Sequence, residues 1–275
     1  MAFKSNKVVM TPEETLKSFF KVGTELVSIG NIRLGLYGDT KVGKTHFILG
    51  LPETKFIIDI DGNVKDLISK FPQSIQENTH VFECSPFNPV SNILDYDYVV
   101  ERIEECVKVV HSYIKGLPED TPKGFIIIDS ATELWEYLGF WLSMQTDLAR
   151  SKNTGKMVQT EWGRVNTKYK IIMDHLVDTG WHIILNARSD NEYSESGARL
   201  GATKPKWQKN TPAFCNVVAE MTFNGVDRTL TFDDVRFSSA QFISMRGVEV
   251  KNPTWESMVK TISDKTKVTF EWYTS

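Results

Sequence analysis

The sequence has few cysteines, no long hydrophobic run and no excess of positive charge. Its three cysteines, Cys84, Cys106 and Cys215, lie far apart and show no metal-ligand spacing, so we expect reduced, mostly buried thiols. No apolar stretch approaches the roughly 18 residues of a membrane span, and the N-terminus lacks the apolar block of a signal peptide. These absences exclude a disulfide scaffold and predict a cytoplasmic protein without a membrane segment.

The charge balance excludes a protein that is basic throughout. The net charge is −3 over 275 residues, so any contact with nucleic acid must come from a local basic patch. Hydrophobic residues make up 41% and charged residues 24%, which is typical of a globular chain that buries a substantial core. The five histidines form no pair with ligand spacing, and we therefore expect no zinc site.

The segment from residue 38 to residue 45 fits the pattern G-x-x-x-x-G-K-[ST] at every required position. An apolar strand precedes it and an apolar helical segment follows it, which is the context that this phosphate-binding loop needs. Its backbone amides are expected to bind phosphates, Lys44 to contact the β- and γ-phosphates, and Thr45 to bind Mg²⁺. The predicted nucleotide-binding residues are Gly38, Asp39, Thr40, Lys41, Val42, Gly43, Lys44, Thr45 and His46.

A second strong signal is the strand at residues 124–129, in which four apolar residues precede Asp129. This pattern predicts a buried parallel strand that delivers an acid to the sheet edge. In a P-loop protein such an acid holds the magnesium ion together with the loop threonine. We therefore expect Asp129 and Thr45 to form the metal site, and Ser130 to cap the following helix.

A third strand, residues 55–61, ends in two carboxylates, Asp59 and Asp61. Asp61 lies nearest the carboxyl end, where it would orient or deprotonate the attacking water. The alternative is a turn-forming Asp-Gly pair, and the sequence alone does not separate Asp59 from Asp61. The strand at residues 181–188 ends in Asn186 and Arg188, which either sense the γ-phosphate or bind a neighbouring loop. The predicted catalytic residues are Lys44, Asp61, Asp129, Asn186 and Arg188.

Two polar segments, residues 150–158 and 189–212, lack any periodicity. Cations that follow phosphates, with an aromatic ring on which a base stacks, are what binding of single-stranded nucleic acid requires. We expect both segments to be loops that bind single-stranded nucleic acid, and the alternative is a solvated charged face. The candidate residues are Lys152, Lys156, Arg199, Lys204, Lys206, Trp207 and Lys209.

The chain as a whole predicts an α/β fold with a mostly parallel central sheet flanked by helices. A hairpin over residues 217–232, with Asn224-Gly225 at its turn, predicts an antiparallel extension at the C-terminal end. We expect a helical N-terminal extension at residues 1–30 and an ATPase core at residues 31–250. Residues 251–275 would then add a cap, with a helix at 254–262 and a strand at 267–273.

These motifs together resemble RecA-type P-loop ATPases, in particular the small ones of phages and archaeal viruses, some of which are associated with single-strand annealing and recombination. The resemblance covers about residues 31–237. It rests on the loop at 38–45, the strand ends at Asp61 and Asp129, and the segments 161–164 and 185–188. RecA proteins carry a glutamate where this chain has Asp61, and a glutamine where it has Ala187 or a neighbour.

The resemblance implies an ATP- and Mg²⁺-dependent ATPase that binds single-stranded DNA and acts in viral or phage recombination or replication, in the host cytoplasm if it is virus-encoded. It also implies a ring or filament of identical subunits, in which an arginine from a neighbour completes the site. The candidates for that arginine are Arg188, Arg228, Arg236 and Arg246. Two alternatives are a nucleotide or small-molecule kinase, and a nucleotide-gated assembly module with little turnover.

Overall fold

A nine-stranded sheet forms the centre of the molecule. The computed structural model describes residues 11, 30–145, 161–193, 199–237, 245–268 and 270. The strands follow the order β3-β2-β4-β5-β1-β7-β8-β9, and β6 pairs with β5 outside this path. Their bounds are β1 Arg33–Gly38, β2 Lys55–Asp59, β3 Thr79–Glu83, β4 Phe125–Asp129, β5 His182–Tyr193, β6 Arg199–Pro205, β7 Val217–Phe223, β8 Arg228–Val235 and β9 Glu249–Lys251.

Helices cover both faces of the sheet. The core between the sheet and α5, α6 and α7 contains Ile126 and Ile128 of β4, whereas Phe125 and Ile127 belong to the core beneath α2, α3 and α9. Successive side chains of a strand point to opposite faces, so a strand that is buried on both faces is apolar throughout. The helices are α2 Lys44–Leu49, α3 Val64–Ile68, α4 Gln73–Glu77, α5 Tyr96–Lys115, α6 Ala131–Gln145, α7 Trp162–Asp178, α8 Thr211–Phe214 and α9 Trp255–Thr266.

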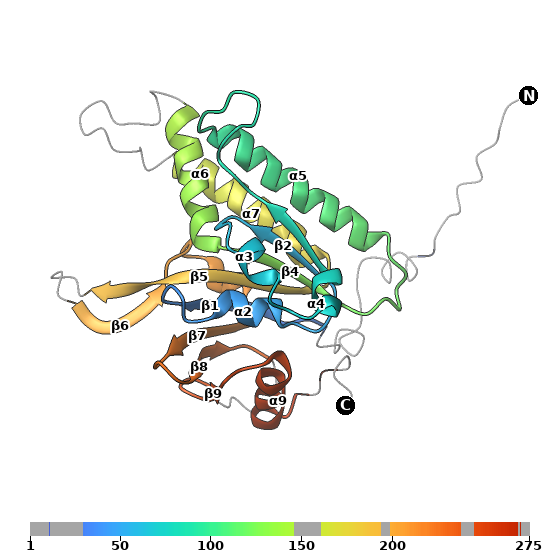
Figure 1. The fold of residues 1–275 in the computed structure, drawn as a ribbon, viewed down its shortest axis with the longest axis vertical. Coiled ribbons are helices and arrows are strands. Elements are labelled where there is room, and N and C mark those ends of the chain that lie inside the picture. Colours follow the sequence, from blue (N-terminus) through green and yellow to red (C-terminus); the bar gives the residue numbers. More distant parts are fainter. Residues whose placement is uncertain are drawn as a thin grey trace, which may run out of the picture.

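The predicted fold class is confirmed. β1 to β5 and β7 pair in parallel, whereas β8 and β9 add an antiparallel extension at the C-terminal end of the chain (Figure 1). The predicted C-terminal helix is α9, which begins at a capping box of Thr254 and Ser257. Most of the expected N-terminal helix and of the expected strand at 267–273, together with the loop at 150–158, lies outside the described residues.

The expectation that residues 189–212 lack regular structure is wrong. β5 continues to Tyr193, β6 pairs with it in an antiparallel ladder, and this two-stranded arm projects from the body of the molecule (Figure 1). Opposed positions in the arm include Asp190 with Lys204 and Asn191 with Thr203. Because an exposed ribbon needs no apolar face, it leaves no alternating hydrophobic pattern in the sequence.

No helix in the described ranges combines the length and the hydropathy of a membrane span. The three cysteines are free thiols, of which Cys84 and Cys215 are buried and Cys106 is half-buried.

Lys55, at the start of β2, is a buried charge that the sequence analysis did not single out. Its side chain is 0% exposed, and its Nζ has no hydrogen-bond partner among the described residues. Burial lowers the pKa of Lys55 from 10.5 to about 8, because the charged form loses its hydration. The unfavourable contribution to stability is therefore complete below pH 8 and disappears above pH 10.5.

We expect Lys55→Met to raise the free energy of unfolding at pH 7, by up to about 3 kcal/mol, because it removes this unpaired charge. The advantage over the parent protein should shrink between pH 8 and pH 10.5, as Lys55 loses its proton. Thermal and urea denaturation across this pH range would measure both effects. Lys108→Met, at an exposed position of α5, is the matched control and should show neither. A constant difference between parent and Lys55→Met at all pH values would contradict the prediction.

Candidate functional site

Polar side chains from neighbouring parallel strands meet at one edge of the sheet. Asp59 of β2 lies opposite Asp129 of β4, and Asp129 lies opposite Asn186 of β5. Gly38, at the end of β1, lies opposite Arg188. The carboxyl ends of parallel strands share one edge, which is where ligands of open α/β sheets bind.

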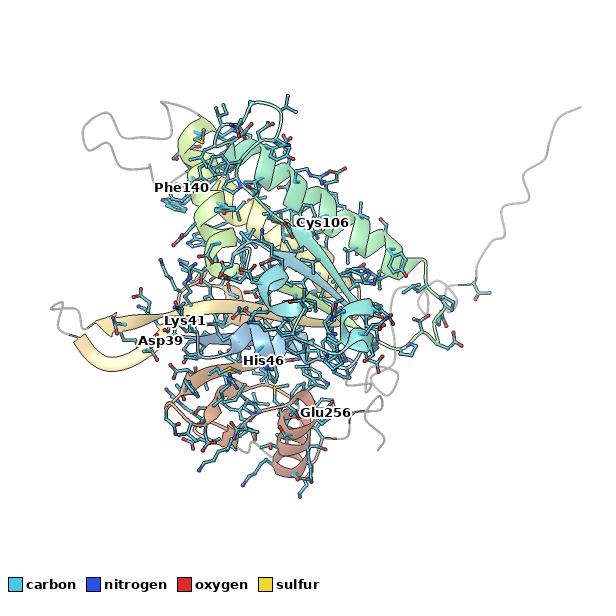
Figure 2. The ribbon with its side chains drawn as sticks, in the orientation of Figure 1. Asp39, Lys41, His46, Cys106, Phe140 and Glu256 are labelled. Carbon is cyan, nitrogen blue, oxygen red and sulfur yellow. The ribbon has the colours of Figure 1, made fainter. Side chains whose placement is uncertain are left out.

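The loop between β1 and α2 has a backbone that depends on its glycines. Gly38 has φ 153°, and a Cβ there would lie 2.1 Å from the carbonyl oxygen of Met221 on the neighbouring strand. Gly43 has φ 103° and Lys41 has φ 69°, so both residues are in the left-handed region. Successive amides in such a loop turn towards a common point and bind an anion there. Figure 2 shows Asp39, Lys41 and His46 along this loop and α2.

Lys44 is held within this loop. Its side chain is 8% exposed, and its Nζ donates to the carbonyl oxygens of Gly38 at 2.9 Å and Asp39 at 2.8 Å. Burial lowers the pKa of Lys44, while the nearby charges of Asp129 and Asp61 oppose this change. The ammonium group is thus fixed beside the loop amides and supported by acids, as a phosphate ligand requires.

Asp129 and Thr45 are in direct contact. The hydroxyl of Thr45 donates to Oδ2 of Asp129 at 3.0 Å, and Nδ2 of Asn186 donates to Oδ1 of the same carboxylate. Burial raises the pKa of Asp129 to about 6, although these two hydrogen bonds favour the charged form. The structure thereby brings together the two predicted metal ligands, which are 84 residues apart in the chain.

The oxygen donors of Thr45 and Asp129 fit Mg²⁺. This ion prefers oxygen ligands and usually takes one or two from the protein, the others being water and substrate phosphates. In the described ranges, no group of three or more histidines, cysteines and acids is placed to hold a metal without such help. The site therefore suits an ion that arrives with a phosphate ligand.

Asp59 and Asp61 have different hydrogen-bond partners in the structure. Asp59 is 0% exposed, and its carboxylate accepts hydrogen bonds from the amides of Gly62 at 2.9 Å, Asn63 at 3.3 Å and Val64 at 3.1 Å. Burial raises the pKa of Asp59, and these three bonds oppose it. Asp59 therefore holds the turn that leads from β2 into α3, and its oxygens are occupied by the backbone.

Asp61 belongs to a cluster that includes a residue missed by the sequence analysis, Glu133. Ser130 Oγ lies 3.3 Å from Asp61 Oδ1 and also donates to Glu133, while Arg188 forms an ion pair with Glu133 and lies 3.7 Å from Asp61 Oδ1. Burial, and then the neighbouring Asp61, raises the pKa of Glu133 to about 7. The sequence analysis expected only that Ser130 caps this helix, and the amide of Glu133 does donate to Ser130 Oγ at 3.4 Å.

A cavity of about 460 Å³ joins these groups. Its walls come from the loop and α2, from the residue that follows β4, from the middle of β5, from α3 and the turn before it, and from Arg228 of β8. Asp61 and Arg188 lie in the same cavity as Lys44 and Thr45. The lining residues are Thr40, Lys41, Gly43, Lys44, Thr45, His46, Asp61, Asn63, Asp66, Leu67, Ser130, Asn186, Ala187, Arg188 and Arg228.

The predicted nucleic-acid residues are not gathered into a continuous basic loop. Lys204 is exposed on the arm but lies opposite Asp190, and Lys206 forms an ion pair with Glu136 at 2.7 Å. Lys209 is exposed just beyond the arm. Lys152, Lys156 and the side chain of Arg199 lie outside what the structure describes.

Trp207, which is expected to stack on a base, is half-buried in the fold. Its indole packs against the main core, where a Cβ on Gly35 would lie 2.5 Å from its Cη2 atom. The ring also contacts Tyr37, with 6.5 Å between ring centroids. Because a flat aromatic ring fills the space left by Gly35, Trp207 anchors the segment after the arm to β1.

A family model described as an AAA domain matches residues 30–263. Comparison with curated proteins gave no match. Among solved structures, a RadB recombinase is similar with a TM-score of 0.46 and 12% identity, over 80% of this chain and 86% of that one. An ATPase from the type III secretion system of pathogenic bacteria is similar with a TM-score of 0.44 and 13% identity, over 70% of this chain and 52% of that one. A KaiC-like protein from Pyrococcus horikoshii is similar with a TM-score of 0.40 and 13% identity, over 81% of this chain and 89% of that one.

We expect Asp59→Ala to lower the free energy of unfolding by about 3 kcal/mol, because three backbone amides lose a charged acceptor. Asp61→Ala is the matched control, since Asp61 accepts no backbone amide in the described residues, and it should change stability by less than about 1 kcal/mol. Urea denaturation of both variants would test the distinction. Equal losses for the two substitutions would show that Asp59 does not hold the turn.

Proposed function

Because this chain belongs to the AAA_24 family of AAA domains, we propose that it is a Mg²⁺-dependent ATPase whose activity is coupled to single-stranded DNA. The observation that carries the proposal is the contact of the buried Asp129 with Thr45, which lines the same cavity as Lys44 and Asp61. A phosphate-binding loop, two oxygen ligands and a further acid in one pocket are what hydrolysis of a nucleoside triphosphate requires.

The chain's own groups would act as follows. The amides of residues 38–45 and the ammonium of Lys44 bind the β- and γ-phosphates, and Thr45 with Asp129 holds Mg²⁺. The bound ion would neutralise charge on the β- and γ-phosphate oxygens. A carboxylate oxygen of Asp61 accepts a proton from the attacking water as its oxygen bonds to the γ-phosphorus. The bond from that phosphorus to the bridging oxygen breaks, releasing ADP and phosphate.

Asn186 is suited to orient the attacking water. Its Nδ2 donates a hydrogen bond to Asp129, and its buried Oδ1 has no hydrogen-bond partner among the described residues. A buried acceptor without a partner costs free energy, which a water that donates to it recovers. Asn186 therefore supplies an acceptor beside the metal site, and Arg188 supplies a positive charge beside Asp61.

The arm is the part of the molecule that we propose binds single-stranded DNA. It carries the exposed Lys204 and is followed by the exposed Lys209, and its base is connected to the cavity. The amide of Lys206 donates to the carbonyl of Arg188 at 2.8 Å, and Ser189 donates to Asp39 of the phosphate-binding loop. Phosphates of DNA bound at Lys204 and Lys209 would lie on a ribbon that contacts the nucleotide site directly.

The biological setting is proposed on the resemblance alone. The small RecA-like ATPases of phages and archaeal viruses suggest a role in recombination or replication, and assembly into a ring or filament.

Lys44→Ala should abolish phosphate release, because it removes the positive charge that the γ-phosphate needs.

Asp61→Asn should lower turnover by about 100-fold or more while nucleotide binding remains, since it removes the proton acceptor and keeps the shape of the side chain. Phosphate release and binding of a fluorescent ATP analogue would measure the two effects. Parent-like turnover in Lys44→Ala would refute the ATPase assignment, and transfer of phosphate to a nucleoside would favour the kinase alternative.

The double substitution Lys204→Ala with Lys209→Ala should weaken binding of single-stranded DNA by about tenfold and flatten its salt dependence, because two phosphate contacts are lost. Fluorescence anisotropy with a labelled oligonucleotide at several salt concentrations would measure this. Lys260→Ala with Lys265→Ala, on the exposed side of α9, is the matched control. Equal affinity of both double variants would discard the arm as the DNA-binding element.

A further inference from the structure

Arg228, the first residue of β8, reaches across to the phosphate-binding loop. A Cβ on Gly43 would lie 2.2 Å from Nε of Arg228, so the guanidinium packs directly on the loop backbone. This Nε is buried and has no hydrogen-bond partner within the described ranges, and no ion pair of Arg228 is found there. An arginine with a buried, unpaired donor that lines an anion-binding cavity lacks the anion that would satisfy it.

Arg228 and Arg188 line the same cavity but lie against different parts of it: Arg228 packs on Gly43, whereas Arg188 lies beside Asp61. Arg188 is close to Asp61, and its charge is felt by the ammonium of Lys44. Arg228 is instead close to His46: burial lowers the pKa of His46, and the charge of Arg228 lowers it further. In such loops the lysine contacts the β- and γ-phosphates, whereas the backbone amides contact the α- and β-phosphates. Because Arg228 packs on the loop backbone at Gly43, its guanidinium lies on the side of the inner phosphates.

The contacts of the Arg228 backbone fix this position. Its amide donates to Oδ1 of Asn252 at 3.0 Å, and its carbonyl accepts from the amide of Asn252 at 2.7 Å. Its guanidinium lies 5.6 Å from the ring centroid of Phe223, across the hairpin between β7 and β8. These contacts orient the side chain, but the ring of Phe223 is 45% exposed and does not satisfy the buried Nε.

We propose that Arg228 binds the α-phosphate of the nucleotide held by its own subunit. The inference rests on the proposed function and adds a residue from the antiparallel extension to the site. It also reassigns one of the arginines expected to act on a neighbouring subunit, because the guanidinium of Arg228 already lies on the loop of its own chain. The ligand class is a nucleoside di- or triphosphate, since both carry the α-phosphate.

Binding of fluorescent ADP and ATP to Arg228→Gln tests the proposal. We expect both affinities to fall by 10- to 100-fold and by the same factor, because both ligands share the α-phosphate. Arg228→Lys, which keeps the charge, should lose less, and thermal denaturation will show whether each variant is folded. Arg102→Gln is the matched control, since Arg102 of α5 forms an ion pair with Glu105 at 2.9 Å, away from the cavity lining. A loss restricted to ATP, or parent-like affinity for ADP, would overturn the assignment.

A mixing experiment separates action within a subunit from action between subunits. Equal amounts of Lys44→Ala and Arg228→Gln should show no more phosphate release than the sum of the two separate samples. Recovery above that sum would mean that Arg228 of one subunit serves the site of another, and would overturn the proposal. If Lys44→Ala alone retains turnover, the ATPase assignment fails. If Lys44→Ala is inactive but Arg228→Gln binds ADP normally, only the present inference fails.

Discussion

The hydrogen bond between Thr45 and Asp129 depends on the register of the parallel strands. β4 and β2 end at the level of Asn186 on β5, and β1 ends two residues further along, at Arg188, so the loop after β1 meets the acid at the end of β4 across the intervening β5. A slip of one residue in β4 would turn Asp129 towards the other face of the sheet and bring Ile128 to its place. The apolar residues of the strands, which set this register, therefore position the polar groups.

The sequence was most informative where local pattern and chemistry coincide. The loop at 38–45 and Asp129 each follow an apolar strand, and strand direction alone placed them on the same edge. Glu133 and Arg228 were beyond such reasoning for two different reasons. Glu133 follows Ser130 in a helix start, where capping accounts for it, and Arg228 begins a hairpin strand 185 residues after Gly43, so only the strand order brings the two together.

The arm shows the opposite limit of sequence reasoning. Its polar residues have no buried face, so hydrophobic periodicity carried no signal, and the run of cations from Arg199 to Lys209 seemed uncompensated. In the fold, the partners come from elsewhere: Asp190 lies across the ladder from Lys204, and Glu136 of α6 binds Lys206. Trp207 likewise seemed free because its cavity above Gly35 is made by a strand 172 residues earlier. The number of cationic and aromatic residues in a chain segment therefore overestimates how many of them are free to bind a ligand in the fold.

The two hydrogen bonds from Lys44 to the carbonyls of Gly38 and Asp39 have a consequence for ligand entry. The ammonium already closes the loop upon itself, so its curvature does not wait for a phosphate to impose it. A ligand that binds to such a preorganised loop loses little of its interaction energy to ordering the chain. Discrimination between ligands then depends on the rest of the cavity wall, because the rigid loop binds any polyphosphate in the same way.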